Sequence, residues 1–396
     1  MATRTGPPSP NRVRPPCPGF GRCGGCAWQH LAYPAQLRQK LERVRRALSH
    51  AAAPAPQSVV PAPAELGYRN KGKYVVAGGV GGALVLGAYE PRTHAVVDTI
   101  GCRVVAPSID RAARRVRATL AASGLAPYDE TTRTGVLRHV VVRADPAGAV
   151  LVCVITTGAA DRDALVPLAT CLLGDGIAGV TRAVNDRPTG AIFDPTAGPP
   201  ELLAGAGHLL EQIGDAALEL GASAFFQVNR DQALRLYGDL ADAACAGPDT
   251  SALDLYCGVG GITFVLAARG ARVLGLESHA GAVATATRAA EAAGLSPRAR
   301  FTRADAASLA ALAPEDLDLV VVNPPRKGLD ADTRAALAAL AAPTIAYVSC
   351  GPESLARDLV DLARVGYRAE LVRAYDFMPG TAQVETLVVL KRSSPA

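Results

Sequence analysis

The sequence has 396 residues, of which 49% are hydrophobic and 19% are charged. A chain of this length and composition can bury cores in two or three domains, which excludes a disulfide-stabilised mini-protein and a wholly disordered chain. The net charge of +5 is concentrated at one end, because residues 1–50 hold nine Lys and Arg against one acid. This local net charge of +8 leaves −3 for the other 346 residues and favours a polyanionic partner.

The N-terminal region is rich in Pro and Arg, and we expect residues 1–16 to form a disordered lead. It contains no apolar signal core, and no run of 18 apolar residues occurs in the chain, so we expect a cytoplasmic protein without a membrane partner. An apolar stripe that follows Pro34 predicts a basic amphipathic helix over 34–50. An Ala/Pro-rich linker is expected over 51–64.

Three cysteines with the spacing C-x5-C-x2-C follow the lead, and a fourth lies further along the chain. They are Cys17, Cys23, Cys26 and Cys102. In a chain without an export signal, this spacing is more typical of a metal site than of disulfides. Four thiolates can hold a zinc ion or an iron–sulfur cluster, and the spacing alone leaves both open.

Short β-like runs dominate residues 68–215 and predict an α+β domain with helices near 107–122 and 162–173. The expected strands are 73–76, 83–89, 95–98, 137–143 and 150–156. Two basic runs in this region are expected to bind RNA phosphates beside unpaired bases. Their members are Arg69, Lys71, Lys73, Arg133, Arg138, His139 and Arg143.

From about residue 250, apolar runs of strand length alternate with Ala/Leu-rich helical segments, the pattern of a doubly wound parallel sheet. The runs are 252–256, 272–276, 317–322, 344–349 and 386–390. Ligands of such sheets bind beyond the carboxyl ends of the strands. A Gly-rich turn around Gly258 follows the first strand and Glu277 ends the second, which indicates a cofactor containing a nucleoside. Thr263 stands where a dinucleotide fingerprint has its third glycine.

Two further strand ends carry reactive groups. Asn323 is followed by two prolines, which give a rigid loop, and then by Arg326. Cys350 lies where a strand passes into a helix, whose N-terminal dipole favours a thiolate, and Arg326 and Lys327 add positive charge nearby. Glu385 enters the last apolar run, where burial is expected to raise its pKa toward that of a useful base.

The Asn-Pro-Pro loop with the Gly-rich turn resembles the class I S-adenosylmethionine-dependent methyltransferases. The motifs together, with the stretch Phe-Phe-Gln-Val-Asn at 225–229, resemble the RNA 5-methyluridine methyltransferase family over nearly the whole chain. The resemblance implies a Rossmann-like methyltransferase domain over 216–396 and a central α+β domain over 17–215 that carries the cysteine site. Gly351, Gly380 and Gln383 depart from the residues common in the family at those positions.

The family's functional residues carry over to matching positions of this chain. Cys350 is the implied nucleophile and Glu385 the implied general base. Residues implied to bind S-adenosylmethionine are Gln227, Tyr256, Gly258, Glu277, Asp305 and Asn323. Members that act on ribosomal RNA carry a four-iron, four-sulfur cluster on the cysteine pattern seen here, so the four cysteines are implied to hold one. Many relatives also carry an N-terminal β-barrel module, for which the residues before Cys17 leave no room.

The function expected from these features is methylation of carbon 5 of a uridine in 23S ribosomal RNA by a monomeric enzyme, through a covalent bond between Cys350 and carbon 6 of the base. Transfer RNA is the alternative substrate. Two other hypotheses are a nicotinamide-dependent dehydrogenase, which leaves Cys350 and Glu385 unexplained, and a non-enzymatic iron–sulfur RNA-binding protein.

Overall fold

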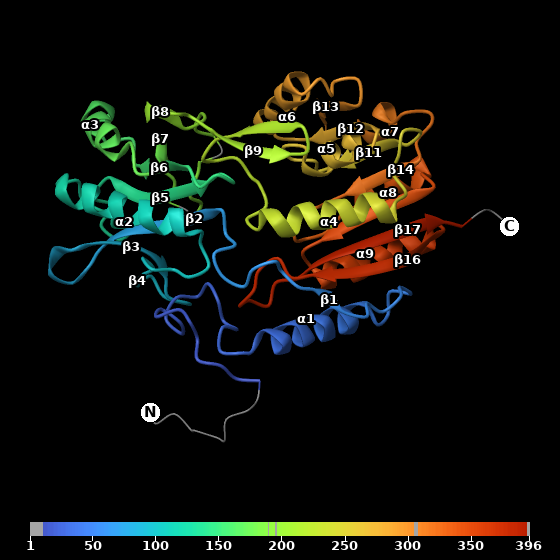
Figure 1. Cartoon of the computed structure of the whole chain (residues 1–396), viewed down its shortest axis with the longest axis horizontal. Coiled ribbons are helices and arrows are strands. Elements are labelled where there is room, and N and C mark those ends of the chain that lie inside the picture. The colour runs from blue at the N-terminus through green and yellow to red at the C-terminus, as the bar shows by residue number, and fades with distance from the viewer. Residues whose placement is uncertain (1–10, 189, 195, 305–307, 394–396) are drawn as a thin grey trace.

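The structure, a computed structural model, describes residues 11–188, 190–194, 196–304 and 308–393. Two lobes lie side by side, one built around each of two large sheets (Figure 1). Among the described residues, no helix is long and apolar enough to cross a membrane.

The C-terminal lobe contains an eight-stranded sheet in the order β1-β16-β17-β15-β14-β11-β12-β13. Its strands are β1 (Val59–Val60), β11 (Ser251–Leu255), β12 (Arg272–Glu277), β13 (Ala299–Arg303), β14 (Leu319–Val322), β15 (Thr344–Ser349), β16 (Tyr367–Tyr375) and β17 (Glu385–Arg392). Strands β11 to β15 are mutually parallel, and β17 runs antiparallel between β15 and β16. This arrangement confirms the predicted doubly wound α/β fold.

Helices cover both faces of this sheet, as its strands require because they are apolar on both sides. The helices after residue 220 are α4 (Arg230–Ala243), α5 (Gly261–Ala268), α6 (Ala280–Ala292), α7 (Leu309–Leu312), α8 (Ala331–Leu340) and α9 (Pro352–Arg364). One apolar cluster joins α4 and α5 to the sheet, and another joins α8 and α9 to its other face. The parallel strands therefore end together at one edge, where loops can form a site.

The central lobe is a seven-stranded sheet in the order β4-β3-β2-β5-β6-β7-β8. Its elements are β2 (Lys71–Gly78), the 3-10 turn η1 (Val80–Gly82), β3 (Leu84–Tyr89), β4 (Val96–Asp98), α2 (Pro107–Ala122), β5 (Leu137–Ala144), β6 (Val150–Thr156), α3 (Arg162–Leu172), β7 (Ile177–Val184) and β8 (Glu201–Gly205). Helices α2 and α3 pack on one face of the sheet. The predicted α+β domain and its strands are confirmed, whereas β7 and β8 were not predicted. A hairpin of β9 (Leu209–Ile213) and β10 (Ala216–Leu220) follows and packs on α5 and α6.

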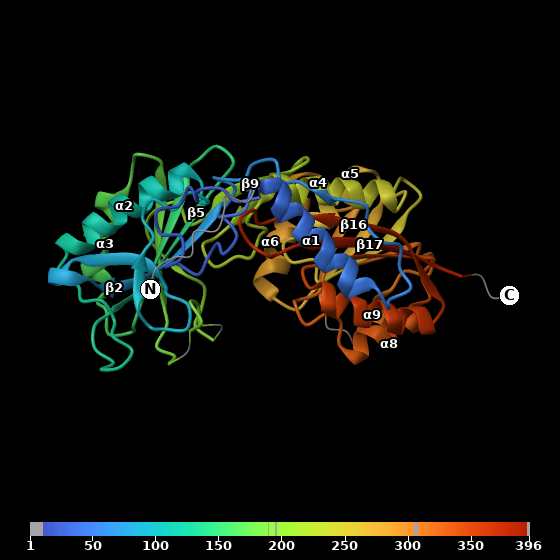
Figure 2. The same cartoon turned by 90° about the horizontal axis from the view of Figure 1, so that it is seen from below.

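The N-terminal helix α1 (Tyr33–Leu48) forms where the apolar stripe predicts it, but it packs on the C-terminal lobe. Val44 and Leu48 are buried in one cluster with Leu359 of α9. The following segment, predicted as a linker, supplies β1, which pairs in parallel with β16. Figures 1 and 2 show α1 crossing beneath β16, β17 and α9. Residues 33–60 therefore belong to the core of the C-terminal lobe, whereas the sequence assigned them to the central domain over 17–215. Their apolar side chains pack on the sheet of the C-terminal lobe.

Candidate active site

Three of the candidate cofactor residues lie at the carboxyl ends of adjacent parallel strands. Tyr256 follows β11, Glu277 ends β12 and Asn323 follows β14. Leu255 pairs with both Leu276 and Val322, so the three ends are neighbours. The turn after β11 takes a left-handed backbone at Tyr256 (φ 61°) and Gly258 (φ 57°). The turn folds back over the end of β12, where the amide of Cys257 donates to the Leu276 carbonyl at 3.2 Å.

Hydrogen bonds fix this turn against the next strand. The backbone amide of Gly258 donates to Oε2 of Glu277 at 3.1 Å, and the amide of His279 donates to Oε1 at 2.9 Å. The Ser278 hydroxyl also donates to Oε1 at 3.1 Å, so the carboxylate is oriented at the edge of the sheet and Oε2 keeps an accepting position for a hydroxyl group. The Tyr256 hydroxyl lies 3.1 Å from Oγ1 of Thr333 on α8, a partner that the sequence did not reveal.

A buried pair beneath the turn links β11 to α5. Asp254 accepts hydrogen bonds from the amide and the hydroxyl of Thr263, at 3.0 and 2.7 Å. Burial raises the pKa of Asp254 to about 7, against the lowering effect of these hydrogen bonds. Thr263 occupies the position of the third glycine in a dinucleotide-binding fingerprint. In this chain it has a structural role instead.

Gln227 lies in the segment that joins the two lobes. Its neighbour Phe226 belongs to one apolar cluster with Val259 of the Gly-rich turn. The side-chain amide of Asn70 donates to the Gln227 carbonyl at 2.9 Å, and Asn229 caps α4. Phe225 is 73% exposed, an unusual state for this side chain that the sequence did not predict. Asp305 lies outside the described residues.

Cys350 and Glu385 face each other where β15 ends and β17 begins. The last antiparallel pair of the two strands is Ser349 with Thr386, so the next residues on each strand are Cys350 and Glu385. Side chains directly opposite each other lie on the same face of an antiparallel pair. The topology therefore brings together two residues that are 35 positions apart in the chain.

The pKa values of the two groups shift upward. Burial raises the pKa of Cys350, the charge of Glu385 raises it further, and Arg326 opposes both effects. Arg326 of the Asn-Pro-Pro-Arg loop therefore lowers the pKa of this thiol as the sequence predicted, but burial and the charge of Glu385 outweigh it and the net shift is upward. Burial raises the pKa of Glu385 to about 8, with Arg326 again opposing. The upward shift of the Glu385 pKa agrees with the prediction from the sequence.

The four N-terminal cysteines are neighbours in space. Burial raises the pKa of Cys26 to about 12, and the charges of Cys102, Cys23 and Cys17 add to this effect. Gly19 and Gly25 border the thiols, since an added Cβ would lie 3.9 Å from Sγ of Cys17 and 3.5 Å from Sγ of Cys23 respectively. Among the described residues, no three His, Cys, Asp or Glu side chains converge closely enough to form a metal site as they stand. The thiols therefore form a loose group.

Several cations predicted to bind RNA are buried instead. Lys71, Arg138, His139 and Arg143 expose at most 7% of their surface. Lys71 and Arg143 donate to the Ala224 carbonyl, and Arg138 donates to the Asn185 carbonyl at 2.6 Å. Burial lowers the pKa of His139 to about 4. These side chains hold loops in place, whereas Lys73 and Arg133 remain exposed.

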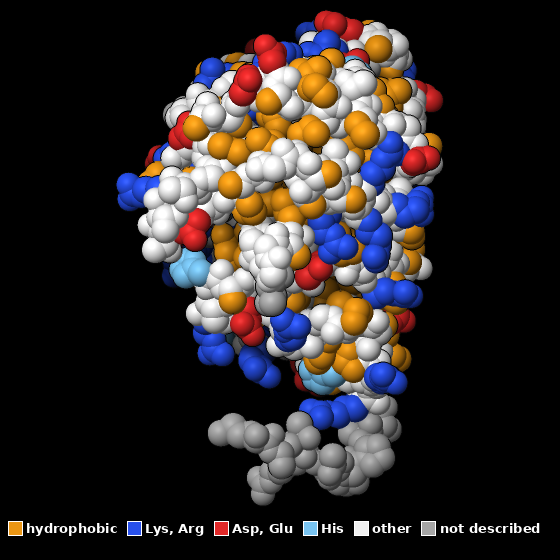
Figure 3. Space-filling view, turned by 90° about the vertical axis from the view of Figure 1, so that its left-hand side faces the viewer, with side chains coloured by type: hydrophobic (Ala, Val, Ile, Leu, Met, Phe, Trp, Pro, Cys, Tyr) orange, Lys and Arg blue, Asp and Glu red, His pale blue; other side chains and the backbone are white. Residues whose placement is uncertain are grey.

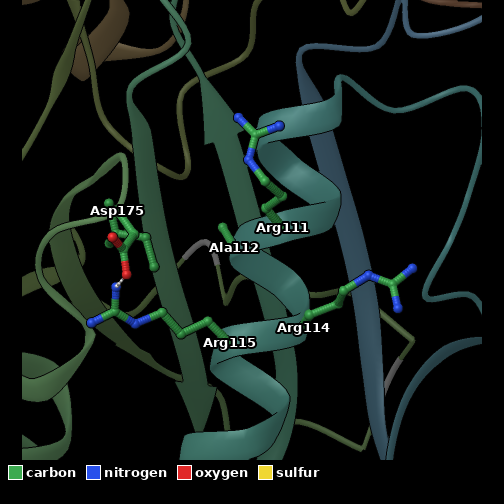
Figure 4. A pocket seen from close by; sticks show the side chains of 6 residues that line it. Arg111, Ala112, Arg114, Arg115 and Asp175 are labelled. Atoms are coloured by element: carbon green, nitrogen blue, oxygen red, sulfur yellow. Dashed lines mark hydrogen bonds and ion pairs between the residues drawn. The ribbon is translucent and has the colours of Figure 1, made fainter.

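A hollow on the outer end of the central lobe carries three arginines of α2 but no convergent site. Arg111, Arg114 and Arg115 point in different directions, and Arg115 pairs with Asp175 at 2.6 Å (Figure 4). Figure 3 shows the same end of the molecule, where basic and acidic side chains alternate with apolar ones. The candidate chemistry therefore lies at the sheet edge of the C-terminal lobe.

Comparison with known proteins identifies the family. A family model described as tRNA (Uracil-5-)-methyltransferase matches residues 216–393. A protein of Halalkalibacterium halodurans, named an uncharacterized RNA methyltransferase, is 32% identical over 97% of this chain and 84% of its own length. The chain belongs to the RNA uracil-C5 methyltransferase family. A family member of Gloeobacter violaceus, also named an uncharacterized RNA methyltransferase, is 33% identical over 97% of this chain and 84% of its own length.

A solved family structure supports the same assignment. The Pyrococcus abyssi tRNA (uracil-54, C5)-methyltransferase, in complex with S-adenosyl-L-homocysteine, superposes with a TM-score of 0.78 at 27% identity. The match covers 96% of this chain and 86% of that one. The predicted enzyme class, an RNA methyltransferase, is thus confirmed.

Proposed function

We propose that this RNA methyltransferase transfers a methyl group from S-adenosylmethionine to carbon 5 of a uracil, with Cys350 as nucleophile and Glu385 as general base. The observation that carries the proposal is the register of β15 and β17, which sets these two residues opposite each other at the edge of the sheet where the Gly-rich turn after β11 also lies. A thiol and a carboxyl group with a raised pKa at one sheet edge fit nucleophilic and base catalysis on one substrate.

The residues at the strand ends fit the methyl donor. The Glu277 carboxylate can accept hydrogen bonds from ribose hydroxyls, and the left-handed turn at Gly258 lets backbone approach the ligand. Gln227, Tyr256 and Asn323 would complete the binding site. When bound there, S-adenosylmethionine supplies an electrophilic methyl group.

The protein's own residues would carry the remaining chemistry. The Cys350 thiolate adds to carbon 6 of the uracil, which makes carbon 5 nucleophilic toward the methyl group. Glu385 then accepts the proton of carbon 5, the double bond between carbons 5 and 6 re-forms, and the carbon–sulfur bond breaks to release Cys350 as a thiolate. The exposed ring of Phe225 offers a surface on which an unstacked base can lie.

We propose 23S ribosomal RNA as the substrate, on the grounds of the cysteine pattern that this chain shares with ribosomal RNA members of the family. Transfer RNA is the second candidate, favoured by the similarity to the Pyrococcus abyssi tRNA (uracil-54, C5)-methyltransferase. The experiment is a single-turnover reaction of methyl-labelled S-adenosylmethionine with separated 23S, 16S and transfer RNA, comparing wild type with Glu385→Gln. We expect label in one fragment of 23S RNA and a denaturation-resistant protein–RNA adduct with the variant. Label in transfer RNA would reassign the substrate, and no label in any RNA would refute the proposed reaction.

We also propose that Cys17, Cys23, Cys26 and Cys102 hold a four-iron, four-sulfur cluster. The mutual proximity of the four thiols and the absence of a Cβ at Gly19 and Gly25 support the fit. The cluster would tie residues 17–26 to the segment before α2, as a cross-link does. Anaerobic purification with iron and sulfide analysis tests this, with about four of each expected per chain. Zinc alone would refute it.

A further inference from the structure

The loop 376–384, which joins β16 to β17, leads directly into Glu385. At its start, Asp376 forms a fully buried ion pair with Lys40 of α1, with an Nζ to Oδ1 distance of 2.5 Å. The same ammonium group donates to the Met378 carbonyl at 3.1 Å. A buried lysine that binds both a side chain and a carbonyl of one loop fixes the position of that loop relative to α1, which carries the lysine.

The middle of the loop is held by the cysteine-bearing segment and by α1. The Gly380 amide donates to Oε1 of Gln36 at 2.7 Å, and the Gly380 carbonyl accepts from the Trp28 amide at 2.8 Å. Gly380 has φ 80°, and an added Cβ would lie 3.0 Å from Cγ of Gln29 and 3.6 Å from Cβ of Cys26. The cysteine-bearing segment therefore packs directly against this loop.

The remaining anchors also come from the N-terminal third of the chain. Arg43 donates to the Ala382 carbonyl at 2.9 Å and the Tyr68 hydroxyl donates to the Pro379 carbonyl at 3.1 Å. Figures 1 and 2 show the loop reaching toward the N-terminal segment. Glu385 pairs with Tyr375 of β16, and the ladder between β15 and β17 begins only at Thr386, so the loop on the N-terminal side of Glu385 is held by these anchors.

We propose that the segment from Cys26 through α1 is a positioning device for Glu385, with Lys40 and Gln36 as its positioning residues. This inference rests on the proposed function. Addition of Cys350 to carbon 6 does not need Glu385, whereas transfer of the carbon 5 proton to Glu385, with release of the Cys350 thiolate, does. Loss of the anchors therefore slows resolution of the adduct and leaves its formation nearly unchanged.

The test is a single-turnover reaction of the full chain with labelled S-adenosylmethionine and substrate RNA, in which the covalent adduct and the free methylated RNA are quantified over time. We expect Lys40→Met to slow adduct resolution about 10- to 100-fold, the size of effect that a misplaced catalytic group produces. Methyl incorporation stays within about twofold of wild type. Hydrogen exchange at the Gly380 amide should accelerate. Arg45→Met is the matched control, since Arg45 lies on the same helix and donates to the Pro56 carbonyl instead.

Two further variants distinguish a positioning role from a folding defect. Lys40→Met leaves Asp376 buried without its partner, so the double variant Lys40→Met, Asp376→Leu removes both charges and still lacks the anchor. Gly380→Ala forces the loop away from Gln29 without removing a charge. Both should show the same slow resolution. An unchanged ratio of adduct to product in folded variants, or an equal slowing of both steps, overturns the positioning role. A wild-type enzyme that methylates no RNA refutes the proposed function instead.

Discussion

Cys350 and Glu385 must both lose a proton in the proposed mechanism, and burial raises the pKa of both. With the pKa of Glu385 at about 8, its carboxylate fraction falls about tenfold for each pH unit below that value. We expect the single-turnover rate to rise steeply with pH from 6 to about 8 and to keep rising less steeply above 8, because the pKa of the Cys350 thiol lies above its ordinary value. A rate that is flat over this range would show that neither group titrates there.

Arg326 influences the pH at which the single-turnover rate rises, because its charge lowers the pKa of both Cys350 and Glu385. We expect Arg326→Met to move the rising limb toward higher pH and Arg326→Lys to restore much of it. Lys327→Met is the control, since the charge of Lys327 lowers the pKa of Asp330 instead. Identical pH profiles for Arg326→Met and wild type would contradict this role.

Phe225 is expected to act on RNA binding alone. Stacking of one base on an aromatic ring contributes about 1–3 kcal/mol, so Phe225→Ala should weaken RNA affinity roughly 5- to 150-fold. Binding of S-adenosylmethionine, measured by calorimetry, should remain as in wild type. Leu210→Ala, at another exposed apolar side chain, serves as the control. An equal loss for both variants would argue against stacking.

At the scale of elements, Thr263 joins α5 to β11 through the buried Asp254. A hydrogen bond to a charged group contributes about 1.5–3 kcal/mol, so Thr263→Val should lower the free energy of unfolding by about that amount. The pKa of Asp254 is about 7 in the fold and near 3.8 when unfolded, so the folded state binds the extra proton between these values and stability falls as pH rises through them. The penalty of Thr263→Val should therefore be larger at pH 8 than at pH 5.

Chemical denaturation at the two pH values measures this difference. Thr285→Val, the same exchange on α6, is the control. A penalty that does not depend on pH would show that the hydroxyl does not interact with the ionised carboxylate.

The elements that the sequence predicted well are those whose pattern is local. Helix α2 lies at the predicted 107–122, and strands β11, β12 and β15 lie within a residue of their predicted bounds, because their apolar runs are continuous. Strand β1 is two residues long and is formed by pairing with β16, so no local sequence pattern predicts it. The buried state of Arg138 and Arg143 depends on distant carbonyl groups, which a single sequence does not reveal. Cys350 and Glu385 were identified as a pair by resemblance, and the β15–β17 register supplied their proximity.

At the scale of the whole molecule, the C-terminal lobe is not continuous in sequence. Helix α1 and strand β1 complete its core, and Leu48 is buried there with Leu359. A fragment of residues 216–396 would expose this apolar surface and the edge of β16. We expect the fragment to bind hydrophobic dyes and to melt without a cooperative transition, whereas the full chain melts cooperatively. A cooperative transition of the fragment would show that this lobe folds without the N-terminal segment.

The ion pair between Lys40 and Asp376 also determines when during synthesis of the chain the loop before Glu385 can be anchored. The two residues are 336 positions apart, and a ribosome that adds about 5–20 residues per second makes the second one roughly 17–67 s after the first. During that interval α1 has been synthesised, while the loop to which it binds has not. A chain that terminates before residue 385 therefore lacks the proposed proton acceptor, so the proposed reaction requires that nearly the whole chain has been made.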